Sequence, residues 1–215
     1  MTRGERLLEL VTVMDRLRSP GGCPWDAEQT HASLVQYLVE ETYETVEAID
    51  ADDRDAMVEE LGDLLLQVVF HARIGQEADQ PFDIDDVAGG IAEKLVARHP
   101  HVFGDATADT AEDVEASWFE RKRREKGRTS VTDGVPMAMP AIPLIEKLLH
   151  RAAKGGVGAP TADPRLAMLL DEMDVGDAIL GLVAAAAARG IDSDAAARGA
   201  AHRLRAALLA AETPP

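Results

Sequence analysis

The chain has 215 residues, enough for one well-packed core or two small domains. Aromatic residues make up only 4% of it while alanine and leucine are abundant, which favours helices over a β-sandwich or a β-barrel. Its 39 acidic and 22 basic residues give a formal net charge of -17, a field that repels nucleic acid and anionic membranes. A local cationic pocket for a small phosphorylated ligand stays compatible with that charge.

Cysteine content and hydropathy indicate the compartment. The single cysteine, Cys23, excludes an intrachain disulfide and fits a reducing environment. No apolar run approaches the ~20 residues of a membrane span, and the first residues lack the pattern of a signal peptide. We therefore expect a cytoplasmic protein without a membrane or nucleic-acid partner.

Apolar residues at helical spacing predict a first helix over residues 4–18. The helix ends in the segment SPGGCPWDAEQTH, whose glycines and prolines break regular structure. Trp25 in this loop either plugs the end of a helical bundle or contacts a ligand, and the residues themselves leave both interpretations open.

Two consecutive predicted helices, about 32–50 and 54–77, each carry a pair of carboxylates. Glu41 and Glu44 lie three residues apart on the first, and Glu60 and Asp63 do so on the second, so each pair shares one helix face. The second helix is apolar on all sides, which predicts that it is buried. If the helices pack antiparallel, four carboxylates meet, repel one another and lose hydration. Mg2+, or Mn2+ in its place, fits such an all-oxygen site.

The rest of the chain predicts further helices. A helix over about 85–98 carries Lys94 and Arg98 on one face, and a helix over 111–126 ends in a basic run that suits a helix C-terminus better than nucleic-acid binding. Residues 127–164 are rich in proline and glycine and form a linker with a short helix at 142–153. The remainder gives two alanine-rich helices divided at Arg189-Gly190. The predicted domains are 1–126, 127–164 and 165–215.

The end of the chain weakly repeats its middle. MLLDEMDVGDAILGLVAAAAARG aligns with MVEELGDLLLQVVFHARIG, so that Asp177 falls on Asp63 and Asp174 on Glu60. The second copy has no counterpart of the EETYE segment. We interpret residues 165–215 as a degenerate repeat that retains packing surface without a complete carboxylate site.

Four further segments occur in order along the chain: GGCPWDAEQTH at 21–31, LVEETYETVEAI at 38–49, EELGDLLLQVVFHA at 59–72 and EKLVARHPHVFGD at 93–105. With these segments the sequence resembles the MazG family of nucleoside triphosphate pyrophosphohydrolases across about residues 5–154. The resemblance implies an all-α helical bundle, completed by dimerisation, that hydrolyses NTPs or dNTPs between the α and β phosphates. It also implies nucleotide-pool house-cleaning and a metal site for Mg2+ formed by Glu41, Glu44, Glu60 and Asp63.

The resemblance and the chemistry together suggest further site residues. Glu40 is a candidate to orient or deprotonate the attacking water. Triphosphate also needs cations and a surface for the base; the candidates are Lys94, Arg98, Arg121 and Lys122 for the phosphates, Trp25 for stacking and Gln29 for a hydrogen bond. We expect His71 to be a satisfied core histidine, and His99 and His101 to shape a turn.

Two other functions remain alternatives at this point. A di-iron oxidoreductase needs Glu-x-x-His on two helices, whereas the chain has only Glu28-x-x-His31 beside the glycine-rich loop. A non-catalytic nucleotide-binding or regulatory scaffold of the same fold would bind metal without turnover.

Overall fold

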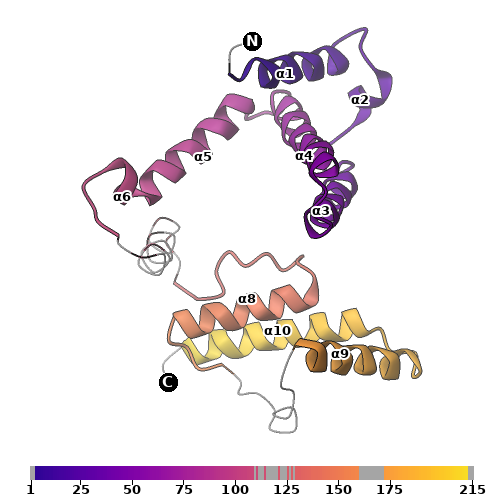
Figure 1. Ribbon diagram of the computed structural model, residues 1–215, viewed down its shortest axis with the longest axis vertical. Coiled ribbons are helices and arrows are strands. Elements are labelled where there is room, and N and C mark those ends of the chain that lie inside the picture. Colours follow the sequence, from indigo (N-terminus) through magenta and orange to yellow (C-terminus); the bar gives the residue numbers. More distant parts are fainter. Residues whose placement is uncertain are drawn as a thin grey trace. The chain divides into compact units, whose positions relative to one another are not determined.

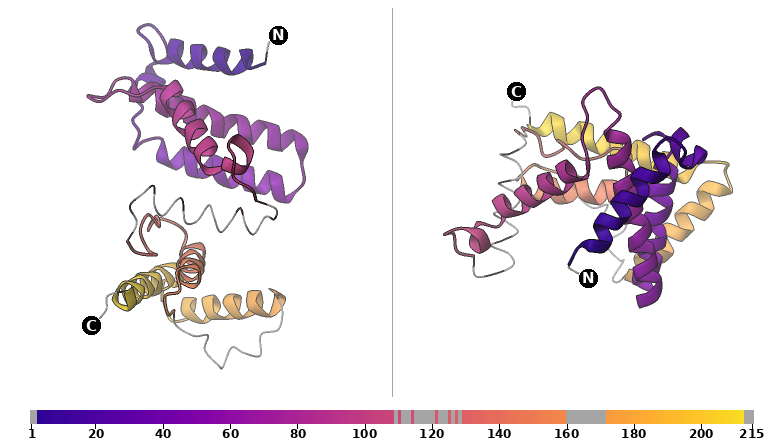
Figure 2. Two further views of the ribbon diagram at one scale, coloured as in Figure 1. Left: turned by 90° about the vertical axis from the view of Figure 1, so that its left-hand side faces the viewer. Right: turned by 90° about the horizontal axis from the view of Figure 1, so that it is seen from above.

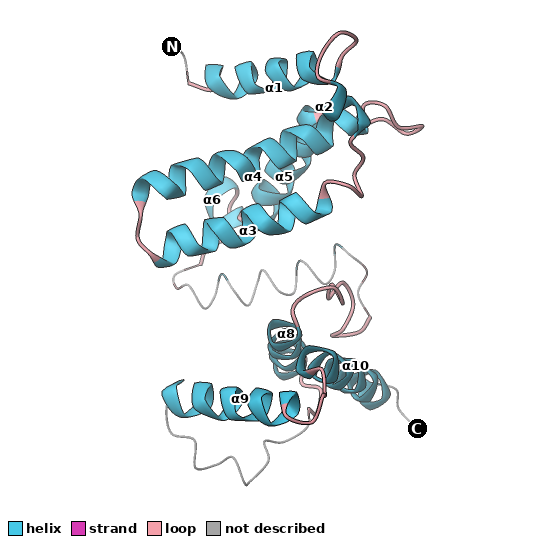
Figure 3. Cartoon of the chain, turned by 90° about the vertical axis from the view of Figure 1, so that its right-hand side faces the viewer, coloured by secondary structure: helices cyan, strands magenta, loops and turns pink. Residues whose placement is uncertain are grey.

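The computed structural model describes residues 3–108, 129–159 and 172–212, with a few single positions between 110 and 127. These residues form helices and connecting loops without a strand, which confirms the predicted all-α class (Figure 3). They divide into two compact units, Met1–Asp109 and Thr110–Pro215, which are described separately. None of the described helices is both long and apolar enough to cross a membrane.

The first unit contains six helices among its described residues. They are α1 (Glu5–Arg18), α2 (Pro24–Glu28), α3 (Val35–Asp50), α4 (Arg54–Gly75), α5 (Ile84–Arg98) and α6 (Pro100–Phe103) (Figure 1). The four long helices lie within three residues of the predicted bounds. The short α2 was not predicted, although proline at its first position is pre-organised for a helix. The helix predicted over 111–126 lies largely outside the described residues.

Helix caps explain where α4 and α5 begin. The Asp53 side chain accepts hydrogen bonds from the backbone N–H groups of Asp55 and Ala56, and Asp83 forms a capping box with Asp86. Because only residues 51–53 separate α3 from α4, the two helices run antiparallel and side by side (Figure 3). This pairing is the framework of the candidate site.

The core of the first unit lies at one end of the α3–α4 pair. Met14 of α1, Leu34, and Val69, Phe70 and Ile74 of α4 are buried together. The prediction that α4 is buried on all sides is wrong for its first half, where Val58 is 62% exposed. The reason is that α3 covers only one face of α4, and the α1 core residue Met14 packs with the last turns of α4.

The second unit contains α8 (Ala141–Lys154), α9 (Glu172–Ala187) and α10 (Ser193–Glu212). Helices α8 and α10 lie side by side (Figures 1 and 2) and bury Leu144 and Leu148 against Ala201 and Leu208. The chain turns after α9 at Gly190, whose φ of 67° suits glycine, where the sequence predicts the break. The segment 127–164, predicted as a linker, thus contributes α8 to this core. That this segment is a linker separate from the last domain stays a prediction.

Candidate metal centre

A cluster of carboxylates lies where α3 passes α4. Oxygen atoms of Glu41 from α3 and of Glu60 and Asp63 from α4 all lie within 4.8 Å of one another, and all three side chains are half-buried. The three-residue spacing of Glu60 and Asp63 places both on one face of α4, and the antiparallel pairing brings Glu41 to that face. Three of the four carboxylates predicted as metal ligands therefore meet.

The fourth, Glu44, is exposed one turn along α3 from Glu41 and acts on the cluster through its charge and through a side-chain hydrogen bond with Glu41. Partial burial, followed by the charges of Asp63, Glu44 and Glu60, raises the pKa of Glu41 above its usual 4.5. Partial burial also raises the pKa of Glu60, with further contributions from Glu44, Glu59 and Asp63. The cluster therefore holds more negative charge than its surroundings stabilise.

This donor set fits a hard divalent cation. All the atoms offered are carboxylate oxygens, the ligands that Mg2+, Mn2+ and Ca2+ share. Within the described ranges 3–108, 129–159 and 172–212 no second group of three potential metal ligands occurs. Asp174 and Asp177 of the sequence repeat thus lie on α9 without a third ligand among those residues.

The raised pKa values predict how pH acts on the metal-free protein. A carboxyl whose pKa is raised on folding stabilises the fold below its unfolded pKa, and that stabilisation is lost as pH rises through the folded pKa. Glu41→Gln removes this loss, so without metal the variant should melt above the wild type at pH 7, with the difference shrinking toward pH 4. Thermal melts in EDTA across this range measure it; a constant difference at all pH values would mean that ionisation of Glu41 is not its cause.

The candidate cations differ in exposure and in the part of the chain to which they belong. Lys94 is exposed on α5 and makes no ion pair with the described residues, whereas Arg98, at the end of the same helix, is buried. Figure 1 shows α5 leading away from α4. Arg121 belongs to the second unit, and Lys122 lies outside the described residues. Glu40 is exposed on α3.

The loop around α2 holds the two residues expected to meet the base. Trp25 is 50% exposed and packs edge-on against Tyr37 and Phe70, with ring centroids 5.9 and 6.5 Å away. Gln29 is already engaged at both ends of its amide: Nε2 donates to the Trp25 carbonyl at 2.9 Å, and Oε1 accepts from the Ser33 hydroxyl at 2.8 Å. Trp25 thus has a free surface, whereas the side chain of Gln29 holds the loop.

A residue that sequence reasoning missed, Arg18, anchors this loop to α4. Its side chain, only 7% exposed, donates to both carboxylate oxygens of Glu77 at 2.9 Å. It also donates to the carbonyls of Asp26 and of Gln29, the latter at 3.0 Å, and its guanidinium lies 6.0 Å from the Phe70 ring centroid. One buried cation thus joins the end of α1, the loop and the end of α4.

Two histidines form a second contact between the loop and α4. The rings of His31 and His71 lie parallel, and their Nδ1 atoms are 2.8 Å apart, so one donates to the other. Burial and the neighbouring His31 lower the pKa of His71, which keeps it neutral. Its Nε2 atom is buried and has no hydrogen-bond partner among the described residues. The prediction of a satisfied core histidine is therefore wrong for this atom.

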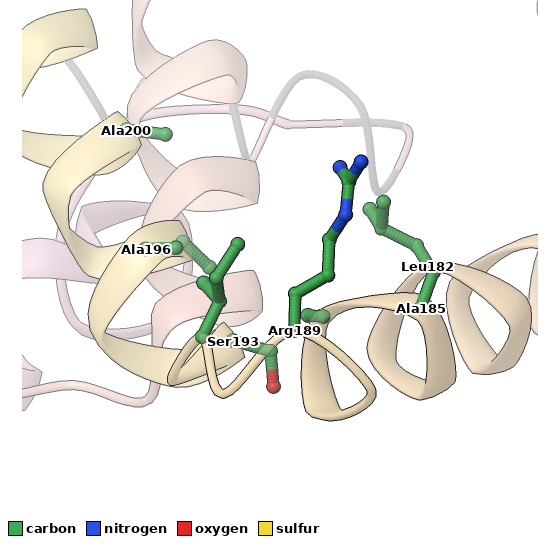
Figure 4. Close-up of a pocket in the computed structure, with 9 residues that line it drawn as sticks. Leu182, Ala185, Arg189, Ser193, Ala196 and Ala200 are labelled. Carbon is green, nitrogen blue, oxygen red and sulfur yellow. The ribbon is translucent and has the colours of Figure 1, made fainter.

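The second unit has a groove between the end of α9 and the start of α10, with a volume of about 400 Å3. Figure 4 shows Leu182 and Ala185 on one side, Ser193, Ala196 and Ala200 on the other, and the Arg189 side chain extending between them. No carboxylate lines the groove. Its lining offers packing surface and no acid–base or metal chemistry.

The fold and the site together define an all-α domain with a carboxylate cluster whose donor atoms fit a metal ion. The profile of the MazG nucleotide pyrophosphohydrolase domain matches residues 29–103, which span the whole cluster. An uncharacterized 26.1 kDa protein in the blaB 3'region of Streptomyces cacaoi is 53% identical over 97% of this chain and 84% of its own length. This chain therefore belongs to the MazG family.

Two similar proteins are named nucleoside triphosphate pyrophosphohydrolases. The Mycobacterium tuberculosis protein is 49% identical over 73% of this chain, and the Escherichia coli K12 protein is 43% identical over 77% of it. This chain spans 48% of the first and 64% of the second. It therefore matches a part of these longer proteins.

Proposed function

We propose that this protein hydrolyses NTPs or dNTPs between the α and β phosphates, giving a nucleoside monophosphate and pyrophosphate, with Mg2+ held by Glu41, Glu44, Glu60 and Asp63. The observation that carries the proposal is the meeting of Glu41, Glu60 and Asp63 within 4.8 Å inside the segment that matches the MazG domain. The names of the relatives support the same reaction.

Each residue has a proposed task. Glu41, Glu44, Glu60 and Asp63 would hold Mg2+, which would neutralise the carboxylates and the triphosphate and stabilise the charge that develops in the displacement. Glu40 takes a proton from the attacking water, whose oxygen forms a new bond to phosphorus as the bridging P–O bond breaks. Lys94 and Arg98, with Arg121 and Lys122, bind phosphate oxygens, and Trp25 stacks on the base.

The direct test is incubation of the purified chain with a panel of NTPs and dNTPs and Mg2+, followed by assay of both products. Equimolar monophosphate and pyrophosphate are expected, with no turnover in EDTA. Release of orthophosphate instead would overturn the proposed bond. Calorimetric metal binding without turnover of any triphosphate would favour the non-catalytic scaffold.

We propose further that the helical bundle is completed by a second copy of the chain. The α4 residues Val58, Leu61, Leu65 and Val68 repeat at spacings of three and four and are all exposed. Helix α3 exposes a similar set, Val35, Val39, Val46 and Ile49. Exposed apolar stripes of this spacing are typical of helices that pack against a partner helix.

The variant Val68→Glu tests the proposed dimer. A charge in the stripe should convert a dimer to a monomer, because burying an unpaired carboxylate costs several kcal/mol. Light scattering coupled to size exclusion measures the mass. Val13→Glu on α1, also exposed, is the matched control that should leave the mass unchanged. A wild type that is monomeric at all concentrations would refute the proposal.

The biological setting follows from the reaction. Hydrolysis of free triphosphates fits nucleotide-pool house-cleaning, which we propose as the role of this reaction. We propose a cytoplasmic location on the basis of the single cysteine and the net charge of -17. We also keep the proposal that residues 165–215 are a degenerate second repeat, because α9 and α10 follow one another as α4 and α5 do.

A further inference from the structure

Two buried polar atoms on α4 have no partner among the described residues: Oε1 of Gln67 and Nε2 of His71. Gln67 is only 5% exposed, so its amide oxygen has left water without gaining a protein hydrogen bond. A buried acceptor without a partner is destabilising. Both atoms are therefore available to a molecule that the protein binds.

Both residues lie on the helix face that carries the carboxylate cluster. Asp63, Gln67 and His71 are spaced four apart, so their directions around α4 differ by no more than roughly 80°. At 1.5 Å per residue, Gln67 lies about 6 Å and His71 about 12 Å beyond Asp63 along the helix axis. A nucleotide with its α phosphate at the carboxylates would extend its sugar and base over this same span.

The chemistry of the pair suits the neutral end of a nucleotide rather than its phosphates. Gln67 Oε1 is an acceptor, and His71 is kept neutral by burial and by His31. The His31 contact occupies Nδ1 of His71, which fixes the ring and leaves Nε2 as the available nitrogen. Gln29, the polar candidate from the sequence, has its amide engaged within the loop.

We propose that Gln67 and His71 form a nucleoside subsite, in which Gln67 Oε1 accepts a hydrogen bond from an amino or hydroxyl group and His71 Nε2 makes a second one. The inference rests on the proposed function, because it assumes that the phosphates lie at the carboxylate cluster. Trp25, which is proposed to stack on the base, contacts Phe70 of the same helix α4.

The variant Gln67→Met tests the subsite, because methionine keeps the unbranched shape and removes the unpaired oxygen. Its melting temperature should equal or exceed that of the wild type. For ATP, kcat/KM should fall about tenfold, the value of one lost hydrogen bond of about 1.4 kcal/mol. The same comparison of variant and wild type with dATP, which lacks the 2′-hydroxyl, and with ITP, which lacks the 6-amino group, identifies the donor. The loss of kcat/KM should disappear for the nucleotide that lacks the group bonded to Gln67.

Two further variants check the subsite, and a binding assay separates it from the proposed function. Gln36→Met on the exposed face of α3 should leave every rate unchanged, and His71→Phe, which keeps the ring stack, should repeat the selective loss. Calorimetric binding of AMP, dAMP and IMP reads the subsite even if no triphosphate is cleaved. Equal losses for all three nucleotides, or none in either assay, would overturn the subsite and assign the two atoms to structural water.

Discussion

Replacing Asp63 by Asn is expected to slow triphosphate hydrolysis strongly while raising the melting temperature of the metal-free protein at pH 7. Asparagine keeps the shape of the side chain and removes one charge from three carboxylates whose oxygens lie within 4.8 Å. Without metal these charges repel, so the variant relieves a strain that helps to raise the pKa of Glu41. With Mg2+ the same charge is needed, and we expect kcat to fall by on the order of 10²–10³ or more.

The opposite signs of the two effects make this prediction specific. A residue that only supports the fold would lose stability and activity together, whereas this one should lose activity and gain stability. Mg2+ should raise the melting temperature of the wild type more than that of the variant, because it binds the intact cluster more tightly. Calorimetric titration of Mg2+ and product assays on the same samples measure both quantities.

Asp55→Asn is the matched control for Asp63→Asn. Asp55 also belongs to α4, but it is exposed in the first turn, where its carboxylate pairs with Arg54. Activity should be unchanged, and the melting temperature should fall slightly because an acidic residue favours a helix N-terminus. Full turnover by Asp63→Asn would place the metal elsewhere, and a lower melting temperature in EDTA would show that the cluster does not repel.

The helices and the carboxylate cluster were predictable because both depend on local spacing. Periodicity locates α1, α3, α4 and α5 within three residues, and the spacing of Glu60 and Asp63 fixes a shared face whatever the helix packs against. The burial of α4 was predicted incorrectly. The apolar residues of a helix indicate how much surface it can bury, but not whether the same chain provides the residues that pack against it.

Contacts between distant segments account for the features that the sequence did not indicate. Arg18 and Glu77 are 59 residues apart, and His31 and His71 are 40 apart. Nothing local to either residue marks its partner. One signal was available: Gln67 is a polar residue inside the apolar run LLLQVVF, where a buried amide requires an explanation. Gln29 is the opposite case. Its position in a motif suggested contact with a ligand, but its amide is hydrogen-bonded within the loop.

Arg18→Met should destabilise the first unit, Met1–Asp109, by about 3 kcal/mol, roughly 13 °C in melting temperature for a unit of this size. Methionine fills the space of the arginine stem but leaves the carbonyls of Asp26 and Gln29 without their buried donor. Glu77, 46% exposed and still paired with Arg73 at 2.8 Å, limits the loss because it can also return to water. Arg6→Met is the control: its ion pair with Glu9 is exposed, and its loss should cost at most about 1 kcal/mol.

The pH dependence of Arg18→Met identifies the cause of its instability. Hydrogen bonding to Arg18 lowers the pKa of Glu77, so the pair stabilises the fold above pH 4.5 and this contribution is lost as pH falls through the folded pKa. The gap to the wild type should therefore narrow on acidification. The chain has one other tryptophan, Trp118, and its replacement by Phe leaves Trp25 as the single emitter. In this background the emission of Trp25 should shift to the red, because the loop that holds Trp25 against Phe70 loses its anchor. A gap that is independent of pH would mean that the ion pair with Glu77 does not contribute and that the carbonyl hydrogen bonds and packing of Arg18 account for the loss. Unchanged Trp25 emission would mean that the loop holds its position without Arg18.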